Sequence, residues 1–179
     1  RDIIAEGAGA CFAAFIANTW GAPVTLSVER AGQTFDVSQF ARITSGSGQG
    51  VTYAPLPNGQ LPPGEVAVLF LARFGNVLTS CPAGVTPAFT TADAAVHGTG
   101  LGEAFRITSS APVVAYDIFP YGGGQSAATS ATLLLPVSVW EDNYIAVNAY
   151  RKSQVVAQAQ PSLDMVAPDE GTTATIRPT

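Results

Sequence analysis

The residues of this chain that could act as nucleophiles, bases or metal ligands are few and widely spaced. His97 is the only histidine, and the two cysteines, Cys11 and Cys81, lie seventy positions apart. A catalytic serine generally needs a histidine within hydrogen-bond reach, which only His97 could supply. His97 stands in a His-Gly-Thr-Gly run, and the chain has no G-x-S-x-G motif around a nucleophile. We therefore expect no catalytic residues and interpret His97 as a loop histidine.

The sequence also contains no motif typical of a metal site or a cofactor-binding site. One histidine and two distant cysteines cannot assemble a zinc site of the usual kind, and the acidic residues are too dispersed for a calcium loop. The glycine-rich runs at 46–50 and 98–102 lack dinucleotide-binding spacing and the lysine of a phosphate-binding loop. The sequence therefore predicts a non-enzymatic protein with no metal site and no cofactor.

The two cysteines have two interpretations, a pair of buried free thiols or one disulfide that closes a long loop. Cys11 opens an apolar, strand-like run, and Cys81 lies in a Ser-Cys-Pro segment typical of a loop. We favour the disulfide. Disulfides persist outside the reducing cytosol, so the pair predicts an extracellular or cell-surface protein. No signal peptide precedes Arg1, and we expect the chain to be a mature or trimmed piece of a longer protein.

The composition indicates a folded protein and excludes two classes of partner. Of 179 residues, 47% are hydrophobic and 12% charged, which is the opposite of a disordered chain. The net charge is −5 and the basic residues are mostly scattered, so we expect no nucleic-acid partner. The longest apolar run, 66–72, ends at Arg73 and is too short to span a bilayer, so we expect no membrane insertion.

Short extended runs separated by turn residues predict an all-β fold, an antiparallel β-sandwich of Ig-like or jelly-roll-like type. Residues 24–29 alternate apolar and polar side chains and turn at 30–33 into 34–37, as in a hairpin. Residues 65–73 are almost continuously apolar, which predicts a strand buried on both faces. Residues 104–108 and 113–119 are expected to form a further strand pair.

The pattern starts again near Trp140, which suggests an internal repeat. We expect strands at 144–150, 163–167 and 172–177, the last two joined by a turn at 168–171. These expectations divide the chain into a β-sandwich module, residues 1–139, and residues 140–179. The second part is interpreted as the start of a second, incomplete β module or as an extension of the first.

A set of strand and turn motifs resembles a known family. The run from Ala104 to Tyr121, then Leu-Leu-Leu-Pro-Val at 133–137 and Asn-Tyr-Ile at 143–145, resembles the N-terminal domain of the IgG Fc-binding protein family, including its bacterial extracellular relatives. The resemblance implies secreted or surface β-sandwich modules, often in tandem, in proteins linked to binding and adhesion. It does not imply Fc binding, because no ligand-contact motif of the family can be matched to residues of this chain.

Two functions of different classes remain open. The first is a non-enzymatic extracellular interaction or adhesion module that binds a protein partner or a surface glycan. Its possible contact residues are an aromatic beside a flexible loop, namely Tyr121, Gly122, Gly123 and Gly124. The second is a self-assembling, filament- or pilus-like subunit whose incomplete part is completed by a strand from another copy. The apolar N-terminal residues Ile3, Ile4 and Ala5 are the expected donor segment.

Overall fold

The computed structural model describes residues 8–75, 79–122, 130–147 and 162–178. The regular structure within these ranges consists of ten strands, one short helix and three 3₁₀ turns, η1 to η3. In chain order the elements are β1 Phe12–Ala17, β2 Val24–Arg30, β3 Gln33–Phe35, α2 Val37–Phe40, β4 Ala41–Ser45, η1 Gly48–Gly50, β5 Thr52–Pro55, η2 Pro57–Gly59, β6 Gln60–Leu61, β7 Val66–Ala72, β8 Phe105–Ser109, β9 Val114–Phe119, β10 Ser130–Leu134 and η3 Val137–Val139.

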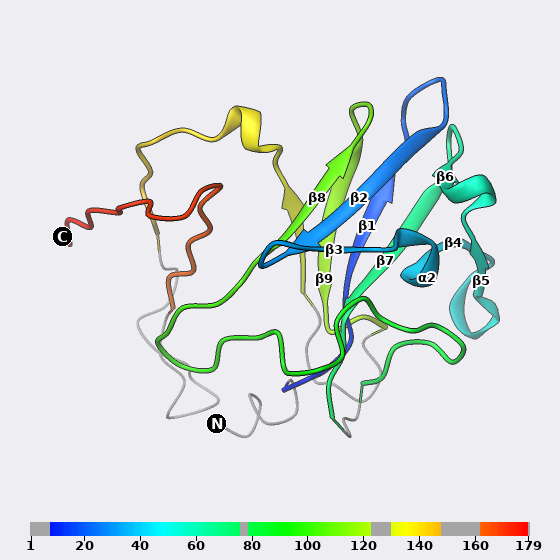
Figure 1. Ribbon diagram of the computed structural model, residues 1–179, viewed down its shortest axis with the longest axis horizontal. Coiled ribbons are helices and arrows are strands. Elements are labelled where there is room, and N and C mark those ends of the chain that lie inside the picture. Colours follow the sequence, from blue (N-terminus) through cyan, green and yellow to red (C-terminus); the bar gives the residue numbers. More distant parts are fainter. Residues whose placement is uncertain (1–7, 76–78, 123–129, 148–161, 179) are drawn as a thin grey trace. The chain divides into compact units, whose positions relative to one another are not determined.

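The strands form two antiparallel sheets. The larger sheet has the order β10-β9-β1-β7-β4-β5. In the smaller sheet β2 is central and pairs with β3, β6 and β8. β2 and β8 lie in front of β1, β7 and β9 in Figure 1, so the two sheets form two layers. The predicted all-β sandwich is therefore confirmed.

The side-chain pattern of two strands explains how the layers meet. In β2, the apolar residues Val24, Leu26 and Val28 are buried and the alternating polar residues are not, as period-2 geometry requires. The predicted hairpin is confirmed, because β2 pairs with β3 through the turn at 31–32. β7 is buried along six of its seven residues, as its continuous apolar sequence predicts. It lies between β1 and β4 near the middle of its sheet.

The expected pairing of 104–108 with 113–119 is wrong. Both segments are strands, but β8 pairs with β2 in the smaller sheet, whereas β9 pairs with β1 and β10 in the larger one. The connection at 110–113 therefore crosses from one layer to the other. Local sequence cannot distinguish this crossing from a hairpin, because both need only a short polar turn between two extended runs.

Asn18 fixes the connection between β1 and β2 from inside the protein. It is 1% exposed. Its Nδ2 donates to the carbonyl oxygens of Ala22 and Leu61, at 2.9 Å each, and its Oδ1 accepts from the backbone N–H of Trp20 at 2.9 Å. All its side-chain polar atoms are thus paired, as burial of an amide requires. The residue joins the β1–β2 loop to β6.

Residues 79–102, called the excursion below, contain no strand or helix and yet are held to the ends of β1 and β7. The predicted disulfide is confirmed: Cys11 and Cys81 are bonded, with Cα atoms 5.0 Å apart. Beside it the N–H of Cys11 donates to the Thr79 carbonyl at 3.0 Å. Further along, the Phe89 N–H donates to Leu71 and its carbonyl accepts from Arg73. The disulfide and these hydrogen bonds hold the excursion in one conformation although it has no regular secondary structure.

Contacts divide the described residues into two units, one that ends at Leu134 and one that begins at Leu135. In the second unit, the predicted turn at 168–171 is present, but the strands expected at 163–167 and 172–177 are not, and residues 144–147 are not extended in a ladder either. A strand needs a neighbour to pair its backbone groups, and among the described residues no strand ladder includes 141–147 or 162–178. Residues 148–150 of the expected strand lie outside the described residues.

Candidate functional site

Arg30, the last residue of β2, is held in place by two aromatic rings. Its Cζ lies 4.3 Å from the ring centroid of Phe89, in the excursion, and 5.5 Å from that of Phe105, in β8. Its Nε donates to the Glu103 carbonyl oxygen at 3.2 Å. Stacking of a guanidinium on aromatic faces is favourable, and here it also fixes the plane of the group. These contacts fix the position of the guanidinium at the end of β2.

Asp93 and His97 form a second cluster in the excursion. The Asp93 carboxylate accepts from the Ala95 N–H at 3.0 Å, and its Oδ2 lies 2.7 Å from His97 Nε2. Burial acts to raise the pKa of Asp93, but hydrogen bonds from the Ala95 N–H, His97 and the Gly9 N–H outweigh it and lower that pKa. The carboxyl group is therefore ionised at neutral pH and acts only as an acceptor. It ties the excursion to the residues that precede β1.

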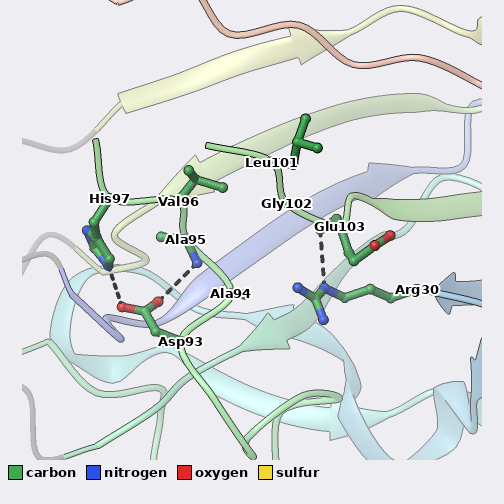
Figure 2. Close-up of a pocket in the computed structure, with 9 residues that line it drawn as sticks. All are labelled: Arg30, Asp93, Ala94, Ala95, Val96, His97, Leu101, Gly102 and Glu103. Carbon is green, nitrogen blue, oxygen red and sulfur yellow. Dashed lines mark hydrogen bonds and ion pairs between the residues drawn. The ribbon is translucent and has the colours of Figure 1, made fainter. Parts of the chain in front are cut away.

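These two clusters line one open pocket of about 420 Å³, called the Arg30 pocket. Figure 2 shows Arg30 on one side of it and Asp93 with His97 on the other. The remaining lining residues are Ala94, Ala95, Val96, Leu101, Gly102 and Glu103. None of these described residues carries a hydroxyl or thiol, so the His97–Asp93 pair has no nucleophile beside it in this pocket. The pocket offers the Arg30 guanidinium, the His97 imidazole and aliphatic contacts.

A second concave surface lies on the outer side of the larger sheet. It is a hollow of about 360 Å³ lined by apolar and aromatic side chains from β1, β7, β9 and β10. Val114 and Tyr116 on β9 are 38% and 43% exposed. We call this surface the open sheet face, and it consists of Phe15, Ala17, Val66, Val114, Tyr116, Ile118 and Ala131. It contains no charged group, so contact with another apolar surface is the chemistry it supports.

Tyr121, expected as a contact residue, is packed beside the open sheet face. Its ring lies 5.0 Å from that of Phe70 and 5.9 Å from that of Phe15, and its hydroxyl is 2.8 Å from the hydroxyl of Tyr53. Burial and this hydrogen bond raise the pKa of Tyr121 above its ordinary value. Gly122 follows in a turn with a φ of 79°. Gly123 and Gly124 lie outside the described residues, so the predicted contact loop stays a prediction.

Other sequence predictions meet the structure only in part. The donor residues Ile3, Ile4 and Ala5 lie outside the described residues. Across the described ranges, no three or more His, Cys, Asp and Glu side chains gather as metal ligands would, and no helix has the length and apolar character to cross a membrane.

Sequence analysis missed both Arg30 and the open sheet face. Arg30 sits in a turn-like sequence, and only its rings, Phe89 and Phe105, distinguish it from the other arginines. Every second residue of 114–118 is apolar or aromatic, which indicates that one side of this strand is apolar. Whether that side is exposed depends on what packs over the sheet. Comparison of the chain with protein-family models, with curated proteins and with solved structures finds no match.

Proposed function

We propose that this chain is a non-enzymatic, extracellular or cell-surface β-sandwich interaction module within a larger or multi-module protein. The observation that carries the proposal is the open sheet face, on which four neighbouring strands present apolar side chains to solvent. Contiguous exposed apolar surface is uncommon on soluble monomers and typically marks a site of contact. The disulfide is compatible with a location outside the reducing cytosol. The resemblance to surface-protein modules supports the same role.

The chemistry of the face points to a protein surface as its occupant. All seven lining residues are uncharged, and the Tyr116 hydroxyl is the one polar side-chain group among them. A glycan needs several polar side chains to replace the water bound to its hydroxyls, which this face does not offer. An apolar protein surface loses no hydrogen bonds here, and a shallow hollow of β-branched and aromatic side chains can bury the apolar core of an ordinary protein interface.

Changing Val114 and Tyr116 together to threonine should weaken partner binding at least about tenfold, because exposed aromatic and aliphatic anchors dominate interface energies. Threonine keeps the strand preference of both positions, so the fold should persist. A partner isolated on the immobilised wild-type chain would be purified and titrated against each variant. The matched control is Trp20→Thr, which removes an exposed aromatic outside the face. Equal affinity of the double variant and the wild type would contradict the proposal, as would binding of a glycan through these residues.

Self-assembly by strand donation is the second candidate, and one edge of the larger sheet favours it. Among the described residues, β10 pairs only with β9, so its other edge presents unpaired backbone groups. Taken by itself, the unit of residues 135–179 also exposes strand-type apolar side chains, with Ile145 92% exposed. An added strand from another copy would satisfy such an edge, and repeated head-to-tail donation would give a filament.

Size-exclusion chromatography with light scattering over a range of protein concentrations tests this candidate. If β10 accepts a strand, Leu134→Lys should abolish the oligomers, because a lysine on an exposed edge opposes edge pairing. The control Thr34→Lys places the same charge on β3, in the other sheet, and should leave assembly unchanged. Deleting residues 1–6 should leave the chain folded but monomeric if Ile3–Ala5 is the donor. A wild-type monomer at every concentration would rule the candidate out.

A further inference from the structure

We infer that the Arg30 pocket is a carboxylate-binding site for a peptide that carries an aliphatic side chain next to its carboxylate. This site lies on residues different from those of the open sheet face, so either one can fail in experiment without affecting the other. Among the described residues Arg30 forms no ion pair, and its two terminal nitrogens have no hydrogen-bond acceptor.

The guanidinium of Arg30 is held in one orientation, so it can bind a ligand without first being ordered. The Phe89 and Phe105 rings hold its plane and the Nε bond to the Glu103 carbonyl holds its rotation. Figure 2 shows the guanidinium end pointing toward the stretch that carries Ala94, across the pocket. The two terminal nitrogens stay free. Together they can donate two parallel hydrogen bonds to a carboxylate, and we call them the Arg30 fork. Little side-chain entropy is lost when such a fixed fork binds.

The nearby acidic groups limit the ligand to a single carboxylate. Asp93 forms no ion pair with Arg30, and its carboxylate accepts hydrogen bonds from the Ala95 N–H, His97 and the Gly9 N–H. Asp93 and Glu103 nevertheless line the same pocket and would repel a ligand with several negative charges. One cation beside two acids therefore suits a ligand with one carboxylate, not a polyphosphate or a nucleic acid.

The rim of the pocket indicates what accompanies the carboxylate. Leu101 is fully exposed and Val96 is also exposed, and both line the opening. Gly102 lets Val96 lie against the backbone, since a Cβ at residue 102 would be 2.4 Å from Val96 Cγ2. The rings of Phe89 and Phe105 both contact the Arg30 guanidinium, so neither offers a free face for a sugar to stack on. An aliphatic side chain beside the carboxylate fits this rim, as at a peptide C-terminus or at Glu within an apolar segment.

The test uses the whole chain and three peptide probes, observed by nuclear magnetic resonance. The probes are N-acetyl-alanyl-alanyl-leucine, the same peptide as its C-terminal amide, and an amide-capped peptide in which glutamate precedes leucine. The free acid should shift the Arg30 Nε–H signal and the amide signals of Ala95 and Leu101, whereas the capped leucine peptide should not. Binding by the glutamate peptide would identify a side-chain carboxylate as a second source of the same group. This comparison needs no variant, so it remains valid if substitution of Arg30 prevents folding.

Variants of Arg30 then test whether its terminal nitrogens bind the peptide carboxylate. Arg30→Gln should weaken binding of the free-acid peptide about tenfold or more, and Arg30→Lys should weaken it less, because it keeps the charge and loses the bidentate geometry. Arg106→Gln on β8 changes the net charge equally and should leave binding unchanged. Equal shifts with the acid and the amide, or full binding by Arg30→Gln, would overturn the inference. Binding of glucuronate without binding of the peptides would overturn the assignment to a peptide.

Discussion

The variant in which both Cys11 and Cys81 are changed to alanine is expected to lose about 4 kcal/mol of unfolding free energy. The disulfide spans 70 positions, and a cross-link of that length restricts the unfolded chain strongly in the chain-entropy model. Cys11 immediately precedes β1 and Cys81 lies near the start of the excursion, so the loss should appear first where the Cys11 N–H donates to the Thr79 carbonyl. This is a large part of the stability of an ordinary domain.

Chemical denaturation with urea measures this loss, and hydrogen exchange of the backbone amides at positions 11 and 89 locates it. The wild-type chain in reducing agent is the matched control and should lose a similar amount of free energy. A change below about 1 kcal/mol in both would show that backbone hydrogen bonds alone hold the excursion, contrary to the argument from chain entropy.

Gly9→Ala is the second substitution with a large expected effect, about 3 kcal/mol or more of destabilisation. Gly9 has a φ of 71°, and a Cβ built on it would lie 2.1 Å from the Phe74 carbonyl oxygen. That oxygen belongs to the backbone and cannot rotate away, so the chain before β1 would have to move. Movement there would weaken the bond from the Phe74 N–H to the Gly9 carbonyl and the bond from the Gly9 N–H to Asp93. Strain and overpacking each cost about 1–3 kcal/mol.

Gly64→Ala separates these two causes. Gly64 has a φ of 76°, close to that of Gly9, but no atom lies within 4 Å of its built Cβ. Alanine at residue 64 should therefore cost only the left-handed conformation, about 1 kcal/mol. Thermal or urea unfolding of both variants gives the comparison. Similar losses for the two would mean that the chain before β1 yields to the added methyl group.

The fold class could be predicted from the sequence, and the disulfide was the favoured of two interpretations of the cysteines. Alternation in residues 24–29 and continuous apolarity in residues 66–72 are local properties, and β2 and β7 follow them directly. The settings of Cys11 and Cys81 favoured the disulfide that the structure contains. Such signals can be interpreted without knowing which strand lies beside which, because each depends only on neighbouring residues and on burial.

Which of these strands are neighbours depends on long-range contacts, and so do both candidate sites. The order β10-β9-β1-β7-β4-β5 and the pairing of β8 with β2 rather than β9 join segments far apart in the chain. The β2–β8 pairing places Phe105 opposite Arg30, and the backbone bonds between the excursion and the end of β7 place Phe89 there. Residues 163–167 and 172–177 have the composition of strands and yet lack partners among the described residues. Strand pairing and side-chain stacking depend on contacts made across long sequence separations, and local propensity does not encode those contacts.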